Sequence, residues 1–486
     1  MSAPSIRKNF VYRLLYEILV VITPLITTPY IARVLEPDGV GIYSYVSSIM
    51  TYFTLFAALG TVSYGSREIA QHRDNKQVAS KLFWEIELMT VLTSSICLIA
   101  WIILIIFSTE YRIFFIAITP TLLATMFDIS WFYTGHEKII YSISWNAICK
   151  ILGIFLMFVF VKEKGDLALY VIINASVLLL GNVSMWIFLP KLLTRVIFST
   201  LSIKKHFRET LIYFIPAVAT TIYTVVDKTL IKVITGDVFQ NGYYEEATKV
   251  INLVKSLVFT SINSVLGARI SYLFAKKADE EIKNRINRSM NFILLLGYGC
   301  MFGIIGISSN FVPFFFGKKY TAVIGLLNTM SVLIIIIGIS NCLGTQYFTP
   351  SGRRKESAKY IIIGCVINLI LNMCMIPALG ATGAVIASII AETTIMVLYL
   401  RNSRDYFDAK GLITLSWKRM VAGTIMCGAV RFIGFLPSNH MFAKLLLQII
   451  IGIIVYSTVL MILKDSLFSE LKTQSMQTIK RYVKKG

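Results

Sequence analysis

The amino-acid sequence predicts an all-α integral membrane protein, because of its composition, its apolar runs and the charges of its loops. Of the 486 residues, 56% are hydrophobic and only 15% are charged, and the mean hydropathy is +0.71. Soluble domains have about 45–50% apolar and about 25% charged residues. The composition therefore argues against a soluble fold.

Fourteen apolar runs separated by polar breaks predict about 14 transmembrane helices, because one span needs about 20 predominantly apolar residues. The first run is interpreted as a span and not as a cleavable signal peptide, since it is long and contains Pro24 and Pro29. The expected helices are 12–32, 40–62, 83–107, 113–134, 139–161, 167–189, 211–234, 245–272, 289–311, 321–345, 359–377, 382–400, 420–436 and 442–463.

The loop charges predict the orientation of the chain. Loops on the side of the N-terminus contain 33 Lys and Arg residues, against 7 on the opposite side. Cytoplasmic loops of membrane proteins carry an excess of these residues. Both termini are therefore expected in the cytoplasm, and the residues after Lys464 are expected to form a basic helix at the membrane surface.

The net charge of +21 would suggest nucleic-acid binding in a soluble protein. In this chain, most basic residues lie in short segments between apolar runs. Anionic membrane lipids are the partner that such loops predict, and no nucleic acid is expected.

Metal and enzyme chemistry are not expected from the residues present. The seven cysteines lie inside apolar runs, without a Cys-x-x-Cys pair, and the four histidines fall one per loop. There is no G-x-x-x-x-G-K-[ST] phosphate loop, and the sequence GVG at Gly39–Gly41 lacks the third glycine and the strand of a dinucleotide site. A membrane glycosyltransferase or polymerase stays open as a third class, but it would need catalytic carboxylates near water.

A weak internal repeat recurs after about 200 residues. Pro24 corresponds to Pro216, and GVGIYSY at Gly39–Tyr45 resembles QNGYYEE at Gln240–Glu246. Repeats of this size suggest two similar bundles with a substrate path between them. A chance match is the alternative.

Charged residues within the expected spans are the candidate functional residues, because a charge at the bilayer centre costs at least about 2.5–3.5 kcal/mol. Fixed cations in a wet cavity would attract phosphate oxygens. The alternative is that Asp227 and Lys228 pair with each other for assembly. The candidates for a cationic substrate-binding cavity are Lys150, Lys228, Lys232, Lys255 and Arg269.

Three carboxylates and two prolines complete the candidate set. Asp128, Asp227 and Glu392 would bind a coupling proton or sodium ion, or else pair with a nearby lysine. Pro24 and Pro29 free backbone groups in the first helix and would bend it, either for gating or simply for packing.

Several segments resemble one known family along nearly the whole chain. They are KNFVYRLLYEILVVITPLITTPYIARVLEPDGVGIYSYVSSI, SYGSREIAQHRDN, TTIYTVVDKTLIKVITGD followed by GYYEEATKVINLV, and TPSGRRKESAKYIIIGCVINLILNMCMIPALGATGAVIASIIAE. In these segments the chain is similar to the Wzx-type polysaccharide flippases of the multidrug/oligosaccharidyl-lipid/polysaccharide exporter superfamily. It departs from them at Gly267-Ala268-Arg269, where relatives often have Leu-Pro-Arg.

The resemblance implies a fold and an activity. The fold would be a V-shaped pair of pseudo-symmetric six-helix lobes, with lobe 1 at 1–210, lobe 2 at 211–400, and two further helices and a basic tail at 401–486. The activity would be non-enzymatic, alternating-access transport of undecaprenyl-pyrophosphate-linked oligosaccharide repeat units, for O-antigen or capsule, across the bacterial inner membrane.

The resemblance also implies partners and one alternative function. A polysaccharide polymerase and a chain-length regulator are expected partners. No cofactor is expected, and the energy source stays open, with a proton or sodium gradient as the candidate that the three carboxylates suggest. The alternative is a small-molecule antiporter for organic cations from the same superfamily. The basic residues within the spans argue against a cationic substrate, because like charges repel.

Overall fold

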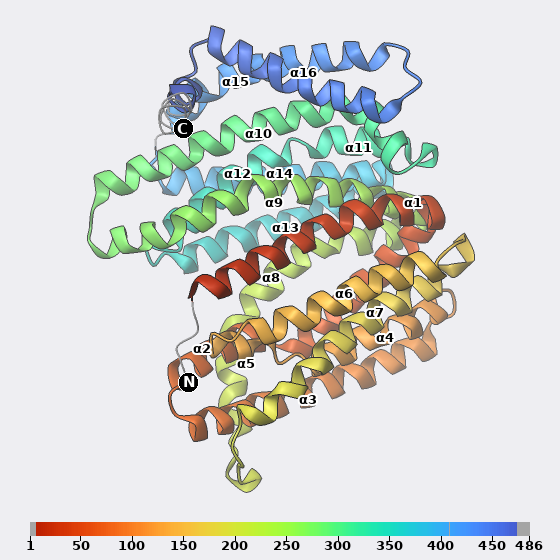
Figure 1. The fold of residues 1–486 in the computed structure, drawn as a ribbon, viewed down its shortest axis with the longest axis vertical. Coiled ribbons are helices and arrows are strands. Elements are labelled where there is room, and N and C mark those ends of the chain that lie inside the picture. Colours follow the sequence, from red (N-terminus) through yellow and green to blue (C-terminus); the bar gives the residue numbers. More distant parts are fainter. Residues whose placement is uncertain (1–5, 408, 474–486) are drawn as a thin grey trace, which may run out of the picture. The chain divides into compact units, whose positions relative to one another are not determined.

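The computed structural model describes residues 6–407 and 409–473, and this part of the chain is helical without a strand (Figure 1). Ten of the described helical stretches are long and apolar enough to cross a membrane. The first of these stretches, Leu14–His72, contains the first two expected spans, and α8, α9 and α15 are not among the ten. The all-α membrane class is confirmed, and the number 14 stays a prediction.

The helices alternate with short turns along the chain. Their bounds are α1 Ile6–Ala58, α2 Thr61–His72, α3 Lys76–Phe107, α4 Arg112–Met126, α5 Ser130–Gly135, α6 Ile140–Phe160, α7 Leu167–Ser184, α8 Ile203–Thr235, α9 Val238–Ala275, α10 Asp279–Phe315, α11 Val323–Met330, α12 Leu333–Leu343, α13 Arg354–Leu379, α14 Ala381–Asn402, α15 Ala409–Phe435 and α16 Met441–Ile462. Short 3-10 segments (η1 Lys164–Asp166, η2 Met185–Lys191, η3 Phe198–Thr200 and η4 Lys318–Tyr320) and a π-helical segment (η5 Gly344–Phe348) lie between them.

The chain forms two compact units, an N-terminal unit at Met1–Gly242 and a C-terminal unit at Tyr243–Gly486. Helix α8 therefore belongs to the N-terminal unit, although the sequence interpretation placed it at the start of the second lobe. The division of the fold at residues 210 and 400 stays a prediction.

Helix α1 contains the break that the sequence predicts between its first two spans. Glu36 has φ 60° and ψ 174° and is the non-helical residue within this 53-residue element. The following Pro37 fits such a boundary, because the residue before a proline is pushed away from the helical region. Pro24 and Pro29 lie within the helical part, so the bend expected there stays a prediction.

Three local features of the N-terminal unit differ from the sequence interpretation. The loop expected after the second span is largely the short helix α2, which begins after the turn at Gly60 (φ 78°). The single span expected at 113–134 is broken between α4 and α5. His206, which was assigned to a loop, is buried in the first turns of α8.

Two apolar clusters hold the N-terminal unit together. One surrounds Trp101, whose ring centroid lies 5.4 Å from that of Phe115 and 4.9 Å from that of Phe53. Trp101 also donates a hydrogen bond from Nε1 to the hydroxyl of Thr119. The other lies around Phe83 and Trp131 and joins α2, α3 and α5. Buried aromatic rings contribute large apolar areas to such clusters.

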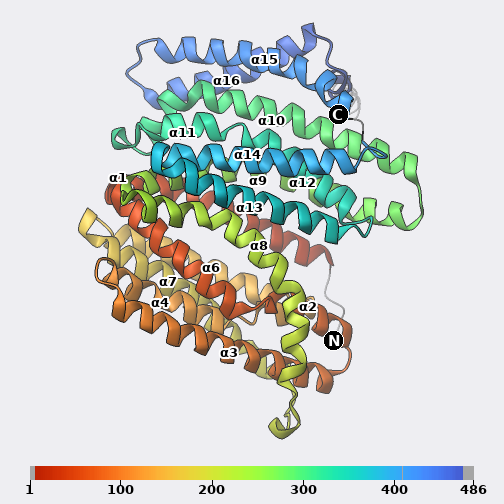
Figure 2. The same ribbon diagram turned by 180° about the vertical axis from the view of Figure 1, so that it is seen from behind.

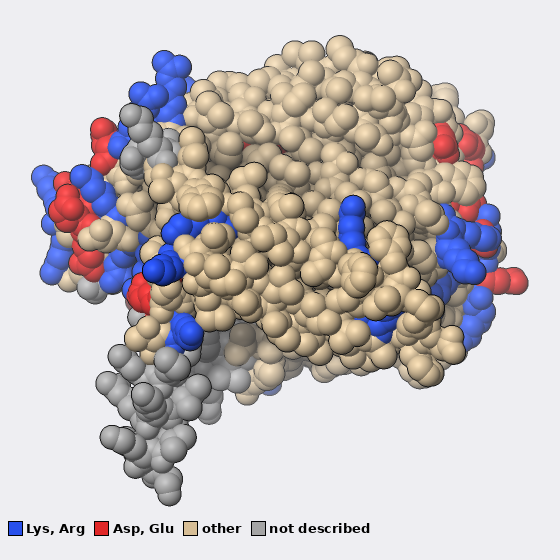
Figure 3. Space-filling model, turned by 90° about the horizontal axis from the view of Figure 1, so that it is seen from above, with Lys and Arg blue, Asp and Glu red and all other residues tan. Residues whose placement is uncertain are grey.

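The C-terminal unit is built around α10, α12 and α14, with α13 packed along α14 (Figure 2). Helices α15 and α16 form a hairpin against α10. The face that this hairpin forms is almost free of charged side chains between its ends, where Lys, Arg, Asp and Glu gather (Figure 3). That distribution is typical of a protein whose middle band contacts lipid.

The basic surface helix expected after Lys464 lies partly outside the described residues. Residues 466–473 are helical, and Leu467 packs with Leu295 and Leu460. Residues 474–486, which contain most of the basic side chains of that segment, lie outside the described part.

Candidate functional site

Lys150 is a basic side chain on α6, a helix apolar enough to span the membrane. Its side chain is partly buried, and it has neither a hydrogen bond nor an ion pair among the described residues. Ser142 and Asn146 precede it at intervals of four residues, so the three polar side chains share one helix face. An ammonium group that lacks a protein partner in such a helix is available to an anionic ligand.

Lys228 and Lys232 lie one turn apart on α8, as the spacing predicts, but Lys232 is held at the helix end. Its Nζ donates to the carbonyl of Gly236 at 2.9 Å and lies 3.4 Å from the Glu110 carboxylate. It also lies 5.3 Å above the ring centroid of Tyr111. These contacts place the Lys232 ammonium group at the C-terminal end of α8, where the helix dipole favours a cation.

Asp227 is buried beside the contact between α8 and α1. Only 3% of its surface is exposed, and its charge interacts with Tyr52 of α1. Thr229, two residues further on, hydrogen-bonds both Tyr52 at 3.0 Å and Ser48 at 2.8 Å. The segment that carries Asp227 and Lys228 is therefore fixed to α1 by side-chain hydrogen bonds.

Lys255 on α9 and Glu392 on α14 come together inside the C-terminal unit. Lys255 is partly buried and interacts electrostatically with Glu392, of which 8% is exposed. The carboxylate thus offsets part of the cost of placing the ammonium group inside an apolar bundle. The structure brings these two sequence candidates together.

A ladder of buried polar side chains continues from Glu392 along α13 and α14. Ser388 lies one turn before Glu392 and accepts a hydrogen bond from Asn368 at 3.2 Å. Asn368 accepts in turn from Asn372 at 3.1 Å. Both asparagines are 0% exposed, so the polar path between the two helices is closed to lipid.

The remaining candidates do not join these groups by any described contact. Asp128 lies in the N-terminal unit between α4 and α5, where it accepts a hydrogen bond from the Ser130 backbone N–H at 2.9 Å. Arg269 lies on α9, but its side chain is outside the described residues. Within the described part of the chain, no group of three or more His, Cys, Asp or Glu residues could hold a metal ion.

Two buried polar networks were missed by the sequence interpretation. In the N-terminal unit, His206 bonds to Tyr64 through Nδ1 at 2.6 Å and to Glu85 through Nε2 at 2.8 Å. The backbone N–H of Ser202 donates to the other Glu85 oxygen at 2.7 Å. This network ties the start of α8 to α2 and α3. The histidine's position in the sequence, just before an apolar run, gave no signal of it.

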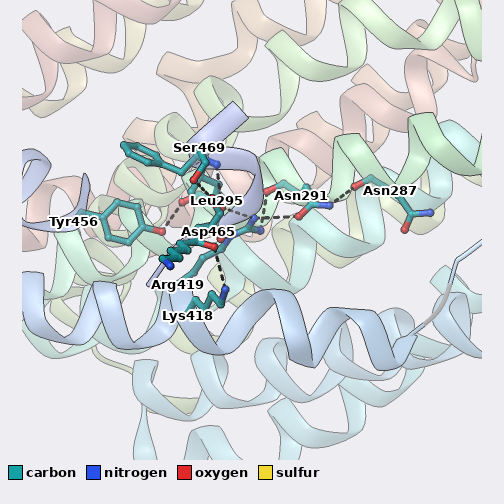
Figure 4. Close-up of polar contacts among 10 residues, drawn as sticks. Asn287, Asn291, Leu295, Lys418, Arg419, Tyr456, Asp465 and Ser469 are labelled. Atoms are coloured by element: carbon teal, nitrogen blue, oxygen red, sulfur yellow. Dashed lines mark hydrogen bonds and ion pairs between the residues drawn. The ribbon is translucent and has the colours of Figure 1, made fainter. Parts of the chain in front are cut away.

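The second missed network joins α15 to α10 and to the segment after α16 (Figure 4). Arg419, 0% exposed, donates from Nε to Asp465 at 3.1 Å and from Nη1 to the carbonyl of Asn291 at 2.9 Å. Tyr456 donates to the carbonyl of Leu295 at 2.8 Å nearby. Arg419 was counted as a loop charge, because it lies at the edge of an apolar run, and Asp465 was not considered.

The family described as "Polysaccharide biosynthesis protein" matches the chain over residues 6–274, which is more than half of its length. The chain belongs to this family. The matched region includes Lys150, Lys228, Lys232, Lys255 and Arg269, so all five basic candidates lie within the part that defines membership.

Relatives in this family extend the similarity to most of the chain. A protein of Escherichia coli (strain K12) named "Putative O-antigen transporter" is 22% identical over 415 residues, which are 82% of this chain and 98% of that protein. "Probable low-salt glycan biosynthesis flippase Agl15" of Haloferax volcanii is 23% identical over 218 residues, 45% of this chain and 46% of that protein.

One solved structure is similar to the whole chain. "Lipid II flippase MurJ, inward closed conformation" matches with a TM-score of 0.72 and 19% identity, covering 96% of this chain and 99% of that one. At this identity the similarity shows the fold alone. The resemblance to Wzx-type flippases and the membrane-transporter fold inferred from the sequence are confirmed by these matches.

Proposed function

We propose that this protein is a flippase that moves lipid-linked oligosaccharide repeat units across the membrane. The observation that carries the proposal is its similarity, over 82% of the chain, to a relative named as an O-antigen transporter. A second relative named as a glycan biosynthesis flippase supports the same substrate class. The substrate would be an undecaprenyl-pyrophosphate-linked oligosaccharide for O-antigen or a related polysaccharide.

The in-span cations give this substrate a chemical basis. A pyrophosphate offers charged oxygens that a lysine ammonium group binds strongly where water is scarce. Lys150 is free to bind such a ligand, since it has no ion pair among the described residues, whereas Lys232 is occupied by Glu110. We therefore assign Lys150 to the substrate headgroup in the N-terminal unit. In the C-terminal unit we assign Lys255, which is only partly buried although it interacts with Glu392.

The proposal also includes the membrane in which the protein acts, its orientation there and the energy source for transport. The protein would act without catalysis in the bacterial inner membrane, with both termini in the cytoplasm, as the loop charges predict. A polysaccharide polymerase and a chain-length regulator would receive the product on the outer side. A proton or sodium gradient would drive the cycle, with Asp128, Asp227 and Glu392 as candidate ion-binding groups.

The test is complementation of a strain that lacks the gene, with Lys150→Met and Lys255→Met variants. Methionine keeps the length and apolar packing of the side chain while removing its charge. Because a charge-assisted hydrogen bond contributes about 1.5–3 kcal/mol, each variant should lower surface glycan by about tenfold or more. The control is Arg431→Met, since Arg431 is exposed and its one described hydrogen-bond partner is the carbonyl of Ile305.

The comparison requires that each variant protein is present in the membrane at the same level as the wild-type protein. Wild-type surface glycan from both lysine variants would contradict the assignment of these cations to substrate. The alternative function, export of small organic cations, predicts a different result. In that case the deletion strain would accumulate cationic drugs while its surface glycan stayed normal.

A further inference from the structure

Glu87 is a buried carboxylate without a hydrogen-bond partner. It lies on α3, within a stretch apolar enough to span the membrane, and 1% of its surface is exposed. Neither of its two carboxylate oxygens has a hydrogen-bond partner among the described residues. A buried ionised carboxylate without a partner is so costly that such a group binds a proton or a cation instead.

A second carboxylate interacts with Glu87 across the N-terminal unit. Asp128 lies at the break between α4 and α5, and its charge interacts with that of Glu87. One Asp128 oxygen accepts the Ser130 backbone N–H at 2.9 Å. Two carboxylates that interact in an apolar region do not both ionise readily, because like charges repel strongly there.

The helix break at Asp128 is built into the packing of this unit. The carbonyl of Ala124 accepts a hydrogen bond from Asn182 at 2.8 Å, and the carbonyl of Phe127 accepts one from Trp186 at 3.0 Å. Both donors come from residues that follow in the chain, on α7 and η2. Discontinuous helices of this kind carry ion-binding groups in membrane transporters, because the break releases backbone groups from the helix.

Apolar rings that precede Glu87 and follow Asp128 in the chain pack against each other. Phe83, one turn before Glu87, stacks on Trp131, with ring centroids 5.6 Å apart, and both belong to the same buried cluster. Trp131 Nε1 and Ser94 Oγ are also buried without a hydrogen-bond partner among the described residues. Trp131 lies three residues after Asp128, and Ser94 lies seven residues after Glu87 on α3.

Glu85, the neighbouring carboxylate on α3, is already engaged by other groups. Glu85 binds His206 of α8 and the Ser202 backbone, and His206 binds Tyr64 of α2. Within the described part of the chain, Asp128 is the one charged group that interacts with Glu87, and no cation from α1, α2, α4 or α8 neutralises it.

We propose that Glu87 and Asp128 form a proton-binding carboxylate pair inside the N-terminal unit. A proton is favoured over a metal ion, because no described group of three or more acidic, His or Cys side chains could hold a metal. Uptake forms one O–H bond at a carboxylate oxygen, and release returns the proton to water. The role of this proton in a transport cycle rests on the proposed function, but the existence of the site does not.

The site can be tested on the purified full-length protein by infrared spectroscopy, without any substrate. A protonated carboxyl has a carbonyl stretch that a carboxylate lacks. We expect this band at neutral pH in the wild type and in Glu280→Gln, a control at an exposed glutamate. We expect the Glu87→Gln variant to lose it and Asp128→Asn to shift it. A band that is unchanged in Glu87→Gln would overturn the proposal, as would one that sodium removes at constant pH.

The coupling role needs proteoliposomes that hold a pH-sensitive dye and are given lipid-linked oligosaccharide. We expect substrate-dependent proton movement with wild type and Glu280→Gln, and at least a tenfold loss with Glu87→Gln. Proton movement at the wild-type rate in Glu87→Gln would overturn the coupling role. A wild-type protein that moves no lipid would instead contradict the proposed function. The infrared result would still show whether Glu87 and Asp128 bind a proton.

Discussion

Gly41 and Gly242 allow the backbones of two helices to approach each other closely in the N-terminal unit. A methyl group added at Gly41 would lie 1.8 Å from the carbonyl oxygen of Val238, and one added at Gly242 would lie 1.9 Å from that of Pro37. Asn241 also donates to the carbonyl of Gly41 at 3.2 Å. The two glycines belong to the segments that the sequence paired as a repeat. The repeat motif therefore marks a place where two helix ends meet.

We predict that Gly41→Ala and Gly242→Ala each destabilise the folded protein. The added carbon must push two backbones apart, and overpacking of this kind costs about 1–3 kcal/mol. The measurement is the thermal midpoint of the purified protein in detergent. Gly428→Ala is the matched control, because no described atom lies within 4 Å of the carbon it adds. Equal midpoints for Gly41→Ala and Gly428→Ala would contradict the prediction.

The candidate site was partly predictable at the scale of residues. Lys150, Lys255 and Glu392 stand out as charges within apolar runs, and in the structure Glu392 is buried and the two lysines are partly buried. Glu87 stands in such a run as well. Its importance depends on what its oxygens contact, and contacts between residues far apart in the chain have no signature in local sequence. For the same reason the position of Lys232 beside Glu110 was not predicted.

At the scale of elements, long apolar helices were predictable and their interruptions were not. Hydrophobic length identifies a span, but at the break beside Asp128 the carbonyls of Ala124 and Phe127 accept hydrogen bonds from distant side chains. The short helix α2 was also missed, because few of its residues are apolar and its exposed face is polar. Its buried face, which includes Tyr64 and Ile69, is defined by packing.

The hairpin of α15 and α16 depends on one buried ion pair. Arg419 and Asp465 are 0% and 3% exposed in their side chains. We predict that Arg419→Met alone lowers the stability of the protein by about 3–5 kcal/mol, because it leaves Asp465 buried without its cation. Removing both charges at once, in Arg419→Met with Asp465→Leu, should restore most of that loss.

The measurement for this pair is the thermal midpoint of each variant together with its yield in the membrane. Lys418→Met is the control, since Lys418 is only partly buried and its described hydrogen bond goes to the carbonyl of Lys464. A double variant that is less stable than Arg419→Met would contradict the prediction. It would show that the ion pair itself stabilises the protein, and not only that a single buried charge without its partner is costly.

A hydrogen bond ties the start of α10 to the segment after α14. Tyr406 donates to Asp279 at 2.7 Å, and this bond, followed by burial, raises the pKa of Tyr406 to about 12. Because the folded state holds this proton more tightly than the unfolded chain, the stabilisation is present below about pH 10 and is lost as the pH rises through about 12.

We therefore predict that one tyrosine of the wild type ionises near pH 12 and that this step is missing in Tyr406→Phe. The measurement is the difference in phenolate absorbance between the two proteins during titration. A difference centred near pH 10 would show that the hydrogen bond to Asp279 has no effect on the phenol in solution.

At the scale of the whole molecule, the loop charges predict the side on which each loop lies. The count of 33 against 7 Lys and Arg residues places the N-terminal side in the cytoplasm. The orientation of a chain in the membrane is set by insertion and leaves no trace in a set of helix contacts, so it has to be measured.

We predict that green fluorescent protein fused after Gly486 fluoresces, because that protein folds in the cytoplasm, whereas alkaline phosphatase at this position stays inactive. Phosphatase inserted after Glu163, in the turn between α6 and α7, should be active, and the same insertion after Asp74, between α2 and α3, should not. The Asp74 and Glu163 insertions control for each other, since both lie at exposed turns of the N-terminal unit. Phosphatase activity after Asp74 or Gly486 would reverse the orientation. It would also place the numerous cytoplasmic cations on the wrong side for contact with anionic lipid.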